Sequence, residues 1–357
     1  MIEQADLKAA VSAGILTEAQ AVSLQALAQN RKSERAVLRP SDEPFELFRG
    51  FNEIFIVVGL GVLTAGWAAF VGISAASEIT NPQRAALLYG PIGAAVIWAL
   101  SEYFIRARRM VAPAITLALL FSANAVTWSV IYFAEPFMVA QENFESLPLP
   151  IAVATALVAV HWLRFRVPFS VAIIALGLFG VALLIAAIEE GSPEGFADLF
   201  QLSATGPFAW ITLALGGAVF VAAMAFDMSD PYRVTRRSAN GFWLHVIAAP
   251  ALINTLALSL LAQDTAQANG LLLAIMALFG VIAIVIDRRS FLIAAIGYIV
   301  VLAMTVFGGE AAATTILALG LVLLGLGAYW ERIRARLMAM LPFLPAHKLP
   351  PFTLNRD

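Results

Sequence analysis

The chain contains no cysteine among its 357 residues, and this absence removes several classes of chemistry. Disulfide bonds, thiolate nucleophiles, iron–sulfur clusters and zinc–thiolate sites all require cysteine. Histidine is almost as scarce, and His161, His245 and His347 lie far apart without the spacing of metal ligands. The sequence therefore predicts no metal site and no cofactor.

Charged residues are few as well, at 13% of the chain, whereas soluble proteins contain about 25%. Hydrophobic residues make up 61%, and the mean hydropathy is +0.85. A fold in water cannot bury this much apolar surface, so the composition requires lipid as the solvent. The first 50 residues lack the apolar run of a cleavable signal peptide, which leaves the first apolar span as the insertion signal.

Catalytic and nucleotide-binding motifs are missing too. The chain has no glycine-rich phosphate loop, no HExxH pair, no GxSxG elbow and no dinucleotide fingerprint. We therefore expect no catalytic residues, no enzymatic activity and no nucleic-acid partner. The expected surroundings are the lipid bilayer.

What the chain does contain is a series of ten windows without a charged residue, each 17 to 28 residues long. A helix needs about 20 residues to cross a hydrocarbon core of about 30 Å, and open sheet edges are excluded from lipid. The sequence thus predicts an all-α polytopic membrane protein, a bundle of about ten transmembrane helices. The windows are 54–77, 85–101, 110–134, 146–163, 167–188, 199–226, 238–263, 265–286, 290–309 and 311–330.

Basic residues fall on alternate connections between these windows. Of the 22 lysines and arginines, all except Arg84 lie on one predicted face of the membrane. Because basic residues are retained on the cytoplasmic side, both termini are predicted to be cytoplasmic. Adding or removing one span would disrupt the alternation, so the number of spans and the orientation support each other.

Three further parts are predicted outside the spans. Residues 1–43 form a cytoplasmic helical hairpin, in which Gly14 ends the first helix and Thr17 with Gln20 begins the second as a capping box. Residues 44–53 form an interfacial helix leading into the transmembrane domain at 54–331, and residues 332–357 form a basic, proline-rich cytoplasmic tail. The hairpin buries too little to be stable alone, so residues 1–40 either dock on the inner loops or on a protein partner, or form a solvated leader.

Polar and helix-breaking residues inside the spans are the candidates for a substrate site. Asn124 and Asn254 are the deepest polar residues, and Pro91 and Pro250 interrupt the second and seventh spans. If the spans divide into two halves of five, these two spans correspond, and paired breaks in inverted repeats indicate a transport site. The alternative is that each asparagine only hydrogen-bonds to a neighbouring helix.

Ionisable residues lie near the predicted inner interface and not near a predicted midplane, which argues against a proton pump or a carboxylate-coupled carrier. The candidates for an inner vestibule that receives a cation or proton are Glu102, His161, Asp227 and His245. The alternative is that each reaches water or pairs with a nearby arginine, such as Glu102 with Arg106 at i,i+4.

Both ends of the chain carry recognisable stretches. The first runs from Leu7 to Leu27, with LKAAVSAGILTEAQ at its start, and continues in RGFNEIF at 49–55; the second runs from Trp330 to Pro351. These stretches resemble an uncharacterised family of bacterial predicted multi-pass inner-membrane proteins with a short N-terminal helical cap. The resemblance implies a bacterial inner membrane and no particular substrate.

Two functions fit these features. The first is a small-molecule permease that works by alternating access between two five-helix halves. The second is a membrane-anchored scaffold or sensor that binds a cytoplasmic partner through residues 1–40. A cavity shared by Asn124 and Asn254 would favour the permease, whereas loss of function on deletion of residues 1–40 would favour the scaffold.

Overall fold

The computed structural model describes residues 10–17, 20, 24, 51–77, 82–135, 138, 144–193, 195–202, 206–233, 235–288, 296–297, 299–300, 309–345 and 348–350. All regular secondary structure in these ranges is helical, which confirms the predicted all-α class. The chain divides into two compact units, Met1–Pro44 and Phe45–Asp357.

The first unit contains the predicted helix stop and capping box. Gly14 has a φ of +69°, a left-handed conformation that glycine adopts without steric cost, and its N–H donates to Val11 O at 3.0 Å. The N–H of Thr17 donates to Gln20 Oε1 at 3.0 Å, and the N–H of Gln20 donates to Thr17 Oγ1 at 3.2 Å. Both local predictions are confirmed. Most of the predicted hairpin, and residues 44–50 of the predicted interfacial helix, lie outside the described residues.

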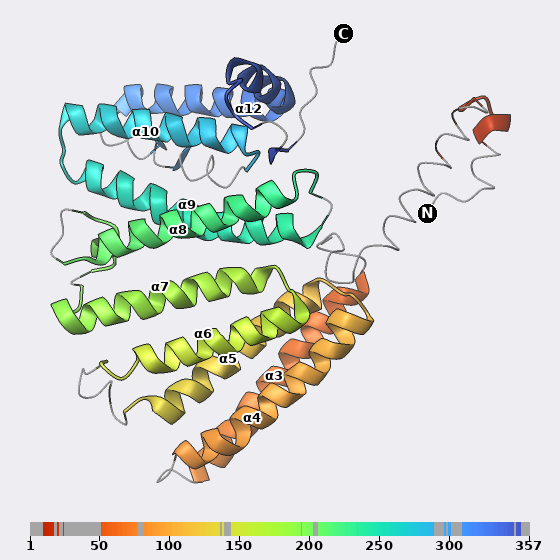
Figure 1. Cartoon of the computed structure of the whole chain (residues 1–357), viewed down its shortest axis with the longest axis vertical. Helices are drawn as coiled ribbons and strands as arrows, with labels where there is room; N and C mark the ends of the chain where they lie inside the picture. The colour runs from red at the N-terminus through yellow and green to blue at the C-terminus, as the bar shows by residue number, and fades with distance from the viewer. Residues whose placement is uncertain are drawn as a thin grey trace. The chain divides into compact units, whose positions relative to one another are not determined.

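The second unit is a series of helices that follow one another in chain order (Figure 1). They are α3 (Phe51–Ser77), α4 (Pro82–Ser101), the π-helix η1 (Glu102–Ala107), α5 (Ala112–Phe133), α6 (Pro148–Phe165), α7 (Phe169–Glu190), the 3-10 helix η2 (Phe196–Leu199), α8 (Phe208–Ser229), α9 (Arg236–Leu261), α10 (Ala266–Val285) and α12 (Gly309–Met340). Within the described ranges, nine helices are long and apolar enough to cross a membrane. The chain therefore has the architecture of an integral membrane protein. The predicted span at 290–309 lies outside the described residues except for 296–297, 299–300 and 309.

Two helix bounds differ from the charge-free windows. α8 begins at Phe208, although its window opens at 199, because residues 196–199 form η2 and residues 200–202 form a loop after it. Ser259 of α9 holds this loop: its Oγ accepts from the N–H of Leu202 at 2.8 Å and donates to Phe200 O at 3.2 Å. α12 continues past the predicted end of the last span and bends at Tyr329, which has φ −113° and ψ 20°.

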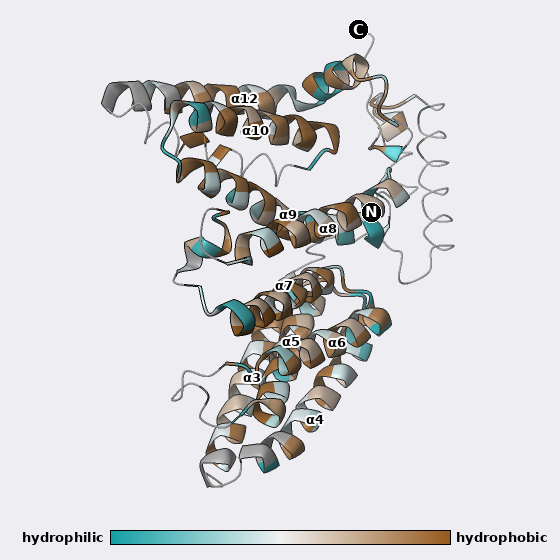
Figure 2. Cartoon of the chain, turned by 60° about the vertical axis from the view of Figure 1, so that its left-hand side comes forward, coloured by the Kyte–Doolittle hydropathy of each residue, from teal (hydrophilic) through white to brown (hydrophobic). Residues whose placement is uncertain are grey.

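Helix packing follows chain order in the main. α8 packs on α9, α6 on α7, and α5 on both α4 and α6, while α7 and α10 also contact α9. Hydrophobic residues run along the helices, and hydrophilic residues gather at their ends and in the connections (Figure 2). This distribution is the one that a lipid solvent selects.

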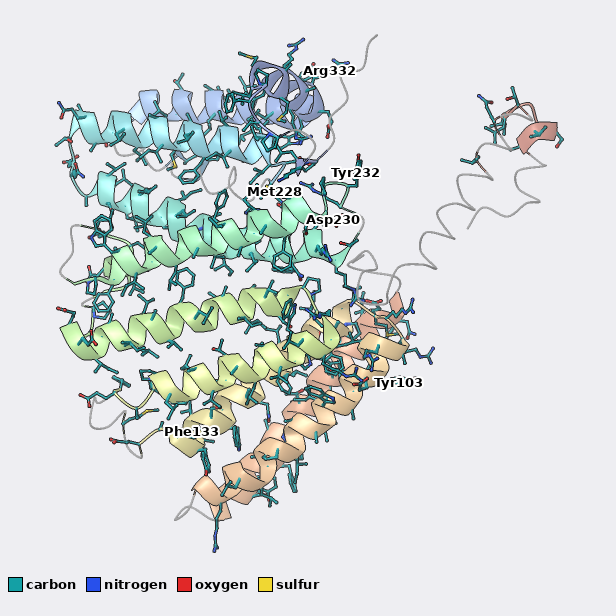
Figure 3. The ribbon with its side chains drawn as sticks, viewed as in Figure 1. Tyr103, Phe133, Met228, Asp230, Tyr232 and Arg332 are labelled. Atoms are coloured by element: carbon teal, nitrogen blue, oxygen red, sulfur yellow. The ribbon has the colours of Figure 1, made fainter. Side chains whose placement is uncertain are left out.

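The basic turns lie together at one end of this bundle. Tyr103, Asp230 and Tyr232 are at the right-hand ends of their helices in Figure 3, whereas Phe133 is at the opposite end of α5. Four turns on the basic side contain a residue other than glycine in the left-handed conformation. Their φ values are +54° at Arg109, +53° at Arg166, +54° at Arg233 and +55° at Asp287.

The C-terminal segment is fixed by a buried arginine. Arg334 of α12 is only 1% exposed, and its guanidinium donates to Ile284 O at 3.1 Å and to Pro350 O at 2.6 Å. Leu349 is buried in the apolar core formed by α9, α10 and α12. The described part of the tail therefore packs onto the end of α10.

Candidate functional site

A cavity of about 500 Å³ lies between α3, α4 and α5. Its wall includes Leu60 and Trp67 from α3, Tyr89 from α4, and Asn124 and Trp128 from α5. A smaller cavity of about 200 Å³ shares part of this wall and reaches Leu157 of α6. Ligand sites in proteins usually have volumes of about 300–1,000 Å³, so the larger cavity has the size of a small-molecule site.

Two glycines of α4 allow this geometry. A Cβ at Gly90 would lie 2.1 Å from Trp128 Cδ1, and a Cβ at Gly93 would lie 2.7 Å from Asn124 Oδ1. Any larger residue would therefore push the α5 side chains away from α4. Asn124 Nδ2 donates to Gly90 O at 3.0 Å and joins the two helices. Pro91 has no N–H, so it leaves the carbonyl four residues earlier without its helical partner and weakens α4 at the cavity.

The polar groups of the cavity wall are uncharged. Apart from Asn124, they are the hydroxyls of Thr64, Thr127 and Tyr89 and the indole nitrogens of Trp67 and Trp128. The indole nitrogen of Trp128 is buried and has no hydrogen-bond partner among the described residues. A buried donor left in this state costs about 1–3 kcal/mol.

The structure brings together two of the four predicted substrate-site residues. Pro91 and Asn124 line the smaller cavity, and Asn124 also lines the larger one. Pro250 and Asn254 lie on α9, and neither lines either of these cavities. The expected sharing of one site by the two asparagines is therefore not found in these two cavities. Asn124 instead bridges α5 and α4, as the alternative interpretation predicts, and lines the cavities as well.

Two of the predicted vestibule residues form one buried polar cluster. His245 Nε2 lies 3.0 Å from Asp227 Oδ2, and the two residues are 0% and 6% exposed. Arg288 was not among the predicted residues, yet its Nε also donates to Asp227 Oδ2 at 3.0 Å and its Nη2 pairs with Asp227 Oδ1. Arg288 Nη2 further donates to Ser238 O at 2.8 Å. The carboxylate, in the last turn of α8, is thus held between His245 of α9 and Arg288, which follows α10.

The other two vestibule candidates belong to the first half of the chain. Glu102, in η1, accepts from Arg106 and from Arg164, each at 2.8 Å, so the predicted i,i+4 pair is confirmed. His161 of α6 is 1% exposed, and its Nε2 lies 3.3 Å from Ser101 Oγ. The four candidates therefore belong to three separate sets of contacts, and neither cavity includes any of them.

A second polar cluster lies beside Asp227, and its charged members, Arg233 and Asp287, lie in turns between the spans. Arg233 pairs with the Asp287 carboxylate at 2.9 Å and donates to the backbone carbonyl of Asp287 at 2.8 Å, while Trp330 Nε1 donates to Asp287 Oδ1 at 2.8 Å. Burial lowers the pKa of the Arg233 guanidinium, and the nearby Arg288 charge lowers it further. Arginine has such a high ordinary pKa that the pair stays ionised at neutral pH. These contacts fasten α12 and the α8–α9 turn to the end of α10.

The described residues contain no group of three or more His, Cys, Asp or Glu side chains that could hold a metal ion. No family model, curated protein or solved structure matches this chain. The resemblance to a family of bacterial multi-pass proteins therefore stays a prediction. The α3–α5 cavity is the feature with the size and lining of a binding site.

Proposed function

We propose that this integral membrane protein is a small-molecule permease whose substrate binds in the α3–α5 cavity. The observation that carries the proposal is the cavity itself, a space of about 500 Å³ within the spans with six uncharged polar side chains on its wall. A site of this kind suits a mainly apolar molecule whose orientation is fixed by a few hydrogen bonds. The proposal assigns no catalytic step to the protein.

The walls of the cavity contain the deformable parts that transport requires. α4 has Pro91 in its interior and passes directly into the π-helix η1, and both features are common places for a helix to bend. α3 is held loosely, with only 6% of its most apolar stretch buried. Movement of α3 and the outer part of α4 against α5 would open and close the cavity. This differs from the predicted mechanism, in which two matched halves rock about a shared site.

The proposed setting is the inner membrane of a bacterium, with both termini in the cytoplasm. Two observations support this setting. Basic residues lie on alternate connections, as expected for cytoplasmic turns, and the two ends of the chain resemble a family of bacterial multi-pass inner-membrane proteins. In this orientation α3 runs outward, so Trp67, Tyr89 and Trp128 lie in the outer half of their spans.

Cysteine accessibility tests the permease, because the chain has no cysteine of its own. Ala68 and Ala69 are adjacent exposed residues of α3, and Ala68 lines the cavity whereas Ala69 does not. Ala68→Cys should react with a membrane-impermeant maleimide from each side of the membrane as the cavity alternates. Ala69→Cys, the matched control, should react from neither side because it faces lipid.

The competing scaffold gives the opposite results. If Ala68→Cys is as unreactive as Ala69→Cys in both right-side-out and inside-out vesicles, the permease proposal is wrong. If deletion of residues 1–40 also abolishes function while insertion is intact, the scaffold takes its place.

A further inference from the structure

The last helix is longer than a membrane crossing requires. α12 has 32 residues and bends at Tyr329. At 1.5 Å per residue, the part from Gly309 to the bend already covers about 30 Å, the thickness of the hydrocarbon core. The helical residues 330–340 therefore lie beyond the length that spans the membrane.

Contacts with the end of α10 fix the level of residues 330–340. Trp330 Nε1 donates to Asp287 Oδ1, just beyond α10, and Arg334 Nε donates to Ile284 O in the last turn of α10. Arg332 lies at the same end of the bundle as Tyr232 (Figure 3). Residues 330–340 are thus held at the basic helix ends, where lipid headgroups meet the hydrocarbon.

The two sides of this segment differ in exposure. Arg334 and Met338, four residues apart, face the protein and are 1% and 4% exposed. Arg332, Arg336 and Met340 are also spaced by four, and all three are exposed. Because residues four apart lie on one side of a helix, the segment presents a separate outer row of two arginines and a methionine.

The outer row continues into apolar residues that are unusually exposed. Phe343 and Met340 are 78% and 76% exposed, the highest values among the large hydrophobic side chains of the described residues. Apolar side chains beside basic ones at headgroup level are typical of a segment that lies in the membrane interface. Lipid would bury both side chains without a change in the fold.

The exposed charges on this surface are almost all positive. Arg332, Arg336 and Lys348 are exposed, and Glu331 is the only acidic residue among the described residues from 330 to 350. Basic segments next to a span are attracted to anionic lipid headgroups. The charge of the surface is therefore complementary to an anionic phospholipid.

We propose that residues 330–343 form a binding surface for anionic phospholipid. Arg332 and Arg336 contact the headgroup phosphate, and Met340 and Phe343 enter the upper part of the acyl region. An acidic cytoplasmic protein has a similar charge, but α12 holds this surface at the headgroups, so lipid is the occupant at hand. The surface goes beyond the proposed permease, because the α3–α5 cavity lies between other helices.

The test uses one fluorophore on the purified full-length protein in nanodiscs. The chain has no cysteine of its own, so Met340→Cys carries a single bimane label at an exposed position. The discs are phosphatidylcholine with a small, equal share of either phosphatidylglycerol or phosphatidylcholine that is brominated on its acyl chains. Bromine quenches only a fluorophore that it touches, so the ratio of the two quenching efficiencies measures the local enrichment of the anionic lipid.

Brominated phosphatidylglycerol should quench several times more strongly than brominated phosphatidylcholine, because each basic residue near the surface changes the lipid preference about fivefold. Arg332→Gln with Arg336→Gln should make the two lipids equal, whereas lysine at both positions should keep most of the preference. The matched control is Arg108→Gln with Arg237→Gln, which removes two exposed arginines from other basic turns and should keep the ratio.

Three results would overturn the inference. Equal quenching by the two lipids in the labelled parent rejects an anionic preference, whether or not the arginine variants insert. A preference that survives in the double glutamine variant rejects the assignment to Arg332 and Arg336. Quenching by aqueous iodide and by neither lipid places Met340 in water and leaves the surface to a cytoplasmic protein.

Discussion

Asp227 is a carboxylate inside the bundle that is contacted from two sides. Arg288 and His245 both contact it, and all three side chains are almost fully buried. A buried charged side chain is tolerated only when it has a partner. The free-energy cost of leaving one charge unpaired exceeds the free energy gained from the ion pair. The cluster therefore fixes the relative positions of α8, α9 and the end of α10.

Removal of one member of this cluster should be costly. We expect Asp227→Ala to destabilise the protein by roughly 3–5 kcal/mol, because Arg288 is left buried without its counter-charge. The double variant with Arg288→Ala should be more stable than the sum of the single effects predicts. Glu102→Ala, the control, removes a partly exposed pair and should cost less than about 1 kcal/mol. Thermal unfolding in detergent compares the parent with the four variants, which include Arg288→Ala alone, and equal losses for Asp227→Ala and Glu102→Ala would contradict the expectation.

At the scale of elements, charge positions predicted where most helices begin and end. Lipid penalises a charged side chain within the hydrocarbon, so charged residues mark the ends of spans. The start of α8 could not be found in this way, because residues 196–207 contain only one charged side chain, and yet α8 begins only at Phe208, after η2. The contacts that Ser259 of α9 makes with Phe200 and Leu202 hold this apolar stretch outside the helix.

The close approach of α8 and α9 depends on a missing side chain. A Cβ at Gly241 would lie 2.3 Å from Asp227 Oδ1 and 3.2 Å from Ala223 O. We expect Gly241→Ala to destabilise the protein by about 1–3 kcal/mol, because the two helices must separate at the buried carboxylate.

Gly217→Ala is the matched control for that substitution. Gly217 lies within α8, and a Cβ there would meet nothing within 4 Å. Alanine favours a helix over glycine by up to about 1 kcal/mol, so this variant should be neutral or slightly stabilised. The unfolding midpoints of both variants are compared with that of the parent. If both lie above it or both lie below it, the contact at Gly241 does not set the spacing between α8 and α9.

For the molecule as a whole, the sequence indicated part of the site and missed the rest. Asn124 was identified because an amide in lipid requires a partner. Trp67 and Trp128 were not, because aromatic residues are common in spans and only tertiary packing shows which of them face a cavity. Arg288 was missed for a related reason. In the sequence it is one of several arginines in the inner turns, and only the packing of α8 beside the end of α10 brings it to Asp227.

The membrane topology can be determined from single cysteines at exposed positions. Ala107→Cys and Tyr232→Cys should be labelled from the same side by an impermeant maleimide, and Gln263→Cys from the other. Phe343→Cys then counts the crossings. If Phe343→Cys is labelled from the same side as Tyr232→Cys, the chain has ten spans, including one at 290–309. If it is labelled from the same side as Gln263→Cys, the chain has nine. Opposite sides for Ala107 and Tyr232 would reject the alternating arrangement of basic turns.

The turns that carry Arg109, Arg166 and Arg233 place an L-amino acid in a backbone conformation that suits glycine better. Each such residue costs about 1 kcal/mol in the finished fold. Arginine at Arg109 and Arg166 is therefore suited to biosynthesis, because a basic turn is held back while the chain is being inserted. Arg233 serves the finished fold as well, since its guanidinium holds Asp287. A variant with glycine at Arg109 and Arg166 should then be harder to insert in the correct orientation, whereas glycine at Arg233 should also weaken the folded protein.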